Sequence, residues 1–166
     1  MYFCQLYWWY DYIAQPRRPI ATTTAPTLPV MNDTTTLPFP APLRVLLLDD
    51  DTFMLDLLAD MLSDLGLDQV RTESNARSAL ASIAADAPTL LICDLSMPDM
   101  DGVDFIRAAA AAGYRGSVML LSGMDSGVRL AAEQQAGVHG LHVLGAFQKP
   151  ILPHQMGAAL APLMAA

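Results

Sequence analysis

The sequence has few basic residues and few cysteines. Lysine and arginine total 9 of the 166 residues against 17 acidic ones, which gives a formal net charge of -8. Such an acidic chain repels a phosphate backbone, so its composition argues against nucleic-acid binding. The two cysteines, Cys4 and Cys93, lack metal-ligand spacing, and Cys93 lies in an apolar run typical of a reduced core residue. This cysteine usage indicates a cytoplasmic location.

Long hydrophobic runs are also missing. No apolar run approaches the ~18 residues needed to span a bilayer, so we expect no membrane insertion. The first residues are rich in aromatic side chains, but they lack the basic start and the small-residue cleavage site of a signal peptide. Hydrophobic residues nevertheless make up 53% of the chain, enough for a sizeable core.

The first quarter of the chain differs from the rest. Residues 16–42 are rich in proline and threonine, a composition with few packable side chains and few backbone donors. We therefore expect a disordered N-terminal extension over residues 1–41 and one folded domain over residues 42–166. The aromatic cluster that opens the extension is either a short docking motif or an untranslated stretch, with translation beginning at Met31.

From Leu43 onward, short apolar strands alternate with helices. We predict a first helix capped by Thr52 and ended by Gly66, a second capped by Asn75, and a helix at 126–136 ended by Gly137. Five such β-α units predict a doubly wound α/β fold: a five-stranded parallel sheet with helices on both faces. The predicted strands lie at 45–48, 69–71, 90–93, 118–121 and 141–147, the last one broken by Gly145, and the other predicted helices at 102–112 and from Pro153 onward.

Chemically active side chains follow the predicted strands. In parallel sheets the functional site lies beyond the carboxyl ends of the strands. The residues found there are Asp49, Asp50 and Asp51 after the first strand, Asp94 after the third, Ser122 after the fourth, and Lys149, the single lysine of the chain, after the fifth.

This set suits phosphoryl transfer to a carboxylate. Clustered carboxylates repel one another, and a divalent cation such as Mg²⁺ relieves that repulsion. An ammonium group adds a second positive charge next to a phosphoryl group. Some acidic residues have simpler explanations: Asp51 suits the positive end of a helix dipole, and Asp99 and Asp101 suit a turn completed by Gly102.

Four segments together resemble response-regulator receiver domains of two-component signalling. They are the acidic strand end at 46–51, the Asp-Leu-Ser-Met-Pro-Asp-Met-Asp-Gly loop at 94–102, the Leu-Leu-Ser-Gly segment at 120–123 and the Phe-Gln-Lys-Pro segment at 147–150. They occur in the order and at the spacing of that family, and the resemblance covers about residues 43–164.

The resemblance implies a role for each matching residue. Asp94 is the phosphoacceptor and a Mg²⁺ ligand, and the backbone carbonyl of Ser96 is a further ligand. The implied partners are a histidine kinase or histidine phosphotransfer protein and an unknown downstream protein target. The only implied reactions are the phosphorylation and dephosphorylation of the chain itself, so we do not expect a conventional enzyme. The remaining roles are Mg²⁺ binding by Asp49 and Asp50, a switch hydroxyl on Ser122, phosphoryl pairing by Lys149 and a cis bond from Lys149 to Pro150.

The sequence departs from the family at two positions. The family usually has an aromatic residue three positions before the lysine, where this chain has Ala146, and strand alternation predicts that Phe147 points to the opposite face. Met124, two residues after Ser122, cannot orient a water molecule strongly, which predicts slow self-dephosphorylation. A degenerate receiver used only as an interaction module therefore stays open. A small aspartyl-phosphate phosphatase fits less well, since Ser96 occupies the position of its second aspartate.

Overall fold

The structure is a computed structural model that describes residues 42–123 and 126–165. The expectations for residues 1–41 and for Met124 fall outside these ranges. Within them, five strands and five helices alternate along the chain. The elements are β1 (Val45–Leu48), α2 (Thr52–Asp64), β2 (Val70–Glu73), α3 (Ala76–Ala85), β3 (Leu90–Asp94), α4 (Gly102–Ala111), β4 (Ser117–Ser122), α5 (Ser126–Val138), β5 (His142–Gln148) and α6 (Pro153–Met164).

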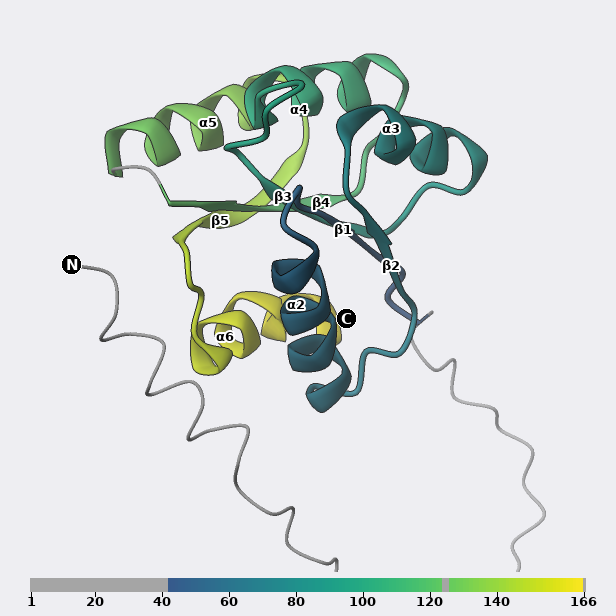
Figure 1. The fold of residues 1–166 in the computed structure, drawn as a ribbon, viewed down its shortest axis with the longest axis vertical. Helices are drawn as coiled ribbons and strands as arrows, with labels where there is room; N and C mark the ends of the chain where they lie inside the picture. Colours follow the sequence, from purple (N-terminus) through teal and green to yellow (C-terminus); the bar gives the residue numbers. More distant parts are fainter. Residues whose placement is uncertain (1–41, 124–125, 166) are drawn as a thin grey trace, which may run out of the picture. The chain divides into compact units, whose positions relative to one another are not determined.

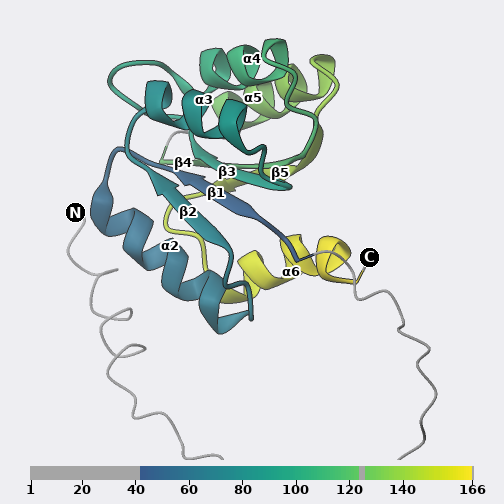
Figure 2. The same ribbon diagram turned by 90° about the vertical axis from the view of Figure 1, so that its right-hand side faces the viewer.

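The strands form one parallel sheet in the order β2-β1-β3-β4-β5. Helices α3, α4 and α5 cover one face, while α2 and α6 cover the other (Figures 1 and 2). Strands β1, β3 and β4 are buried along their whole length, which explains why they read as continuous apolar runs. The predicted doubly wound fold is confirmed.

Two hydrophobic clusters hold the helices to the sheet. One joins β1, β3 and β4 to α3, α4 and α5, with Phe105 and Ile106 among its buried residues. The other lies under α2 and α6 and includes Leu58 and Met156. Because successive strand residues point to opposite faces, neighbours such as Leu46 and Leu47 belong to different clusters.

Some boundaries differ from those predicted. The cap of α2 is Asp51, whose side chain accepts a hydrogen bond from the backbone N–H of Phe53, so the expected Thr52 cap is wrong. Helix α5 continues past Gly137, and the chain turns at Gly140, which has a φ of 75°. Strand β5 runs through Gly145, where a φ of 140° accompanies a register shift against β4.

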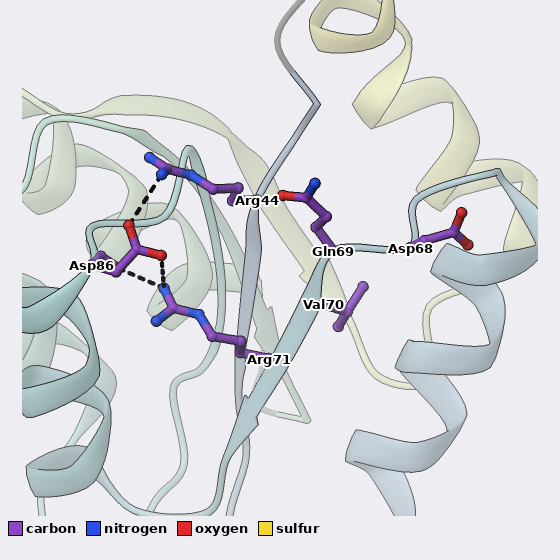
Figure 3. A pocket seen from close by; sticks show the side chains of 6 residues that line it. All are labelled: Arg44, Asp68, Gln69, Val70, Arg71 and Asp86. Atoms are coloured by element: carbon purple, nitrogen blue, oxygen red, sulfur yellow. Dashed lines mark hydrogen bonds and ion pairs between the residues drawn. The ribbon is translucent and has the colours of Figure 1, made fainter.

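An arginine-aspartate cluster ties the end of α3 to the starts of β1 and β2. Arg44 Nη1 donates to Asp86 Oδ1 at 3.0 Å, and Arg71 Nη2 donates to the Asp86 carbonyl at 2.5 Å. Arg44, just before β1, and Arg71, in β2, reach Asp86 at one side of a pocket that Asp68, Gln69 and Val70 also line (Figure 3). Both guanidinium groups bond to the C-terminal end of α3. The cluster therefore serves to hold this end of the helix against the sheet.

Candidate functional site

The register of the parallel strands brings the predicted site residues to one edge of the sheet. Leu48 pairs with Cys93, so the next residues, Asp49 and Asp94, emerge side by side from β1 and β3. Ser122 is the last residue of β4 and pairs with Gln148, the last residue of β5. Lys149 follows directly, and its backbone N–H donates to the carbonyl of Ser122 at 2.9 Å. Residues far apart in sequence therefore share one edge.

Lys149 connects the two central carboxylates. Its Nζ donates to Asp49 Oδ2 at 2.5 Å and lies 2.9 Å from Asp94 Oδ2. The carboxylate side chains are only 2% and 4% exposed and that of the lysine 18%, so the three charges are largely shielded from water. Two buried negative charges thus share one positive charge, which leaves an excess of negative charge at the site.

Asp94 has one oxygen without a partner. Its Oδ1 is buried and makes no hydrogen bond, and it is the sole buried side-chain oxygen or nitrogen in this condition within the described ranges. Asp49, Asp50 and Asp94 each offer an oxygen, and these three oxygens lie within 4.8 Å of one another. An unsatisfied buried oxygen beside two further carboxylates fits a hard divalent cation such as Mg²⁺, which would supply the missing partner.

Burial and hydrogen bonding together shift the pKa values of Asp49, Lys149 and Cys93. Desolvation raises the pKa of Asp49 and outweighs its hydrogen bond to Lys149. For Lys149, burial by itself lowers the pKa, but the hydrogen bonds to Asp49 and Asp94 outweigh it, so its pKa is raised. Lys149 is therefore firmly charged. Burial also raises the pKa of the Cys93 thiol, which is free and buried, in agreement with the interpretation of Cys93 as an unreactive core residue.

The remaining predicted residues occupy distinct places. Asp50 is exposed at the rim of the cluster, and Ser122 is fully buried. Asp51 caps α2, and its backbone N–H donates to Asp49 Oδ1 at 3.0 Å, which orients that carboxylate. Ser96 has an exposed side chain in the loop after β3, and the role of its carbonyl as a ligand stays a prediction. The bond from Lys149 to Pro150 is cis, as expected.

Asp101 and Gly102, at the start of α4, fix the loop that follows Asp94. Asp101 caps α4 by accepting a hydrogen bond from the backbone N–H of Asp104 at 2.9 Å. A Cβ atom on Gly102 would lie 2.6 Å from Leu95 Cα and 2.7 Å from the Asp94 carbonyl oxygen. Gly102 thus allows α4 to start directly against the end of β3. The sequence suggested only a turn here, because close packing between segments leaves no local signal.

The side chains before Lys149 point as strand alternation predicted. Ala146 packs against the cluster under α3, α4 and α5, whereas Phe147 packs against the cluster on the α2 and α6 side. The position that the family usually fills with an aromatic ring therefore holds a methyl group, and Phe147 does not replace it.

None of the described helices has the length and apolar character needed to cross a membrane.

Known proteins are similar to this chain over the same region. The family model of the response regulator receiver domain matches residues 45–161. The chemotaxis protein CheY of Thermotoga maritima is 26% identical over 117 residues, covering 70% of this chain and 93% of the relative. The crystal structure of a response regulator from Colwellia psychrerythraea is similar with a TM-score of 0.66 and 34% identity, covering 75% of this chain and 98% of that one.

Other relatives are much longer than the match. A protein-glutamate methylesterase/protein-glutamine glutaminase from a Nocardioides species is 32% identical over 112 residues, which is 67% of this chain but 28% of the relative. The chain thus spans less than a third of the methylesterase relatives it matches. The match to the family model, the sheet order and the acidic edge agree, and the chain belongs to the response regulator receiver domain family.

Proposed function

We propose that the chain is a phosphoacceptor switch of a two-component phosphorelay, which receives a phosphoryl group on Asp94. The observation that carries the proposal is the state of the Asp94 carboxylate. Lys149 holds one of its oxygens at 2.9 Å, while the other is buried and has no partner. A carboxylate that is fixed at one end and unsatisfied at the other suits a group that takes up a cation and a phosphoryl group.

The proposed reaction is an in-line displacement at phosphorus. An oxygen of Asp94 attacks the phosphorus of a phosphohistidine on a histidine kinase or histidine phosphotransfer protein. The new O–P bond forms an acyl phosphate as the N–P bond breaks, and the imidazole nitrogen leaves with the electron pair of that bond. Lys149 stays charged and pairs with the phosphoryl oxygens, because its raised pKa keeps it protonated at neutral pH.

Asp49, Asp50 and Asp94, with the carbonyl of Ser96, are the residues that would hold Mg²⁺. When bound, the ion neutralises the carboxylates and the charge on the phosphoryl group. The protein residues align the acceptor: Asp51 orients Asp49 through its N–H, and Gly102 holds the loop against β3. Ser122 is the last residue of β4, and in this proposal its hydroxyl binds a phosphoryl oxygen and the surface near β4 and β5 changes in response.

We infer that the signal passes by contact with a downstream protein in the cytoplasm, and that the chain catalyses only its own phosphorylation and dephosphorylation. The composition supports this inference, because the excess of acidic residues argues against nucleic acid as the target.

The test is labelling by a small acyl phosphate, followed by intact mass. The wild-type chain should gain one phosphoryl group with Mg²⁺ and much less in the presence of a chelator, and Asp94→Asn should gain none. Asp99→Asn is the matched control, because it removes an exposed carboxylate from the same loop and should label like the wild type. Equal labelling of the wild type and Asp94→Asn contradicts the proposal.

One observation favours a second function, that of an interaction module that works without phosphorylation. The family usually has an aromatic ring at the position of Ala146. This chain therefore lacks the side chain that would respond to a movement of Ser122. The labelling experiment separates the two functions, because a pure interaction module gains no phosphoryl group under any of the conditions. A phosphatase has less support, since Ser96 stands where such enzymes have a second aspartate.

A further inference from the structure

The buried charges of the site leave their strands on one face of the sheet. Successive residues of a strand point to opposite faces. In β1, Leu47 packs on the α2 and α6 side, and Asp49 is the next residue of the same phase. In β3, Asp94 pairs with Leu121 of β4, which packs on that side as well. Lys149 contacts both carboxylates, so its side chain has to leave the end of β5 on the α2 and α6 side.

Simple alternation along β5 gives the opposite face. Val143 packs on the side of α3, α4 and α5. Counting in steps of two from Val143 assigns positions 145, 147 and 149 to that side too. Phe147, two residues before Lys149, instead packs on the α2 and α6 side. A change of phase between Val143 and Phe147 therefore brings Lys149 to its partners.

A β-bulge makes this change of phase. Val118 of β4 pairs with Val143, but the next residue, Met119, pairs with Gly145, so Leu144 is an extra residue in β5. Gly145 has a φ of 140°, a conformation that residues with a side chain rarely adopt. Because β5 is an edge strand, the extra residue disturbs the ladder with β4 alone.

The ring of Phe147 lies over this bulge. A Cβ atom on Gly145 would lie 3.0 Å from Phe147 Cε2 and 3.1 Å from Phe147 Cζ. The ring thus fills the space that a side chain at position 145 would need, and it also packs against the hydrophobic cluster under α2 and α6. Gly145 suits the bulge in two ways, because it adopts the backbone angle and leaves room for the ring.

We propose that Gly145 and Phe147 are positioning residues for Lys149, because the bulge that they form sets the face from which the lysine leaves β5. Their importance for phosphorylation rests on the proposed function, in which Lys149 pairs with the phosphoryl oxygens. The placement of the lysine is measurable without phosphorylation. The chain has no second lysine to take its place.

The first test measures the rate at which formaldehyde and cyanoborohydride methylate Lys149 with a chelator present. Because Lys149 is the single lysine, a peptide map reports its Nζ without overlap. Gly145→Ala strains the bulge and presses on the Phe147 ring. The Lys149 side chain is 18% exposed in the wild type, so its release to solvent should raise the rate about fivefold. An unstructured peptide with one lysine calibrates the reagent in each reaction.

Gly140→Ala is the matched control. Gly140 also has a positive φ, 75°, so alanine strains the backbone there as well, but its Cβ atom would meet nothing within 4 Å and it lies before β5. Lys149 should stay as protected in this variant as in the wild type. Labelling of Asp94 by a small acyl phosphate with Mg²⁺ should slow in Gly145→Ala and not in Gly140→Ala, whereas a general loss of stability would affect both.

Phe147→Leu is the milder variant. It keeps an apolar side chain in the cluster but removes the ring from Gly145, so it should also speed methylation, and it decides the question if circular dichroism shows that Gly145→Ala is unfolded. Wild-type protection of Lys149 in the deciding variant, or equal rates in Gly145→Ala and Gly140→Ala, overturns the proposal. A wild type that protects Lys149 but gains no phosphoryl group contradicts only the proposed function, because methylation does not depend on phosphorylation.

Discussion

Replacement of Lys149 by methionine tests the electrostatics of the site directly. The ammonium group is 2.5 Å from Asp49 Oδ2 and 2.9 Å from Asp94 Oδ2, and both carboxylate side chains are nearly inaccessible to water. Methionine keeps most of the side-chain length but leaves two buried negative charges without a counter-ion. Removal of one partner from a buried ion pair costs about 3–5 kcal/mol, and we expect Lys149→Met to lower the free energy of unfolding by that amount.

The measurement is urea unfolding followed by circular dichroism at neutral pH with a chelator present. Arg107→Met is the control, because its guanidinium also lies close to a carboxylate, Asp104, at 2.7 Å, but both side chains are more than half exposed. An exposed pair of this kind contributes at most about 1 kcal/mol. A cost for Lys149→Met that is no larger than the cost for Arg107→Met refutes the electrostatic reasoning.

The pH dependence and a double variant sharpen the same prediction. Desolvation already raises the pKa of Asp49, and without Lys149 nothing offsets it through an ion pair, so folding takes up a proton and the cost of the substitution shrinks as the pH falls toward the raised pKa of Asp49. Adding Asp49→Asn to Lys149→Met removes one of the unpaired charges and should recover part of the loss. The free-energy changes of Lys149→Met and of Asp49→Asn alone are then compared with that of the double variant. If the two single changes sum to the double one within about 0.5 kcal/mol, the charges do not interact.

Three further predictions concern stability and the loop after β3. Tyr114→Phe removes the hydroxyl that donates to the buried carbonyl of Ser117 at 2.8 Å, and urea unfolding should show a loss of about 1–3 kcal/mol. A loss below about 0.5 kcal/mol would show that this bond is dispensable. Gly102→Ala forces a Cβ atom to 2.6 Å from Leu95 Cα, which should cost about 1–3 kcal/mol and slow labelling of Asp94; normal stability and labelling would contradict the tight packing. Lys149 has a raised pKa in the folded chain, so its contribution is complete below the unfolded value of 10.5 and is lost as the pH rises through the folded value. Alkaline unfolding curves should therefore fall more steeply above pH 10.5 for the wild type than for Lys149→Met, and parallel curves would refute the assignment.

The sequence by itself determined the fold class and most members of the site. Buried strands such as β1 and β3 appear as continuous apolar runs, and the residues that follow them are conspicuous because a charge directly after such a run is rare. Asp49 and Asp94 could therefore be selected without coordinates, whereas Lys149 was conspicuous as the single lysine of the chain. Strand alternation also separated Ala146 from Phe147 correctly, because each residue's face depends only on its place in the strand.

Only the tertiary structure decided how these residues are arranged. Lys149 and Asp49 are 100 residues apart, and their 2.5 Å contact depends on the parallel register of four strands. The unpaired Asp94 Oδ1 and the close approach at Gly102 follow from packing around them. Glycine marks helix ends only weakly, so α5 could pass Gly137 and expose Val138. Local preferences set element types, but distances and unsatisfied atoms arise from segments that are remote in sequence.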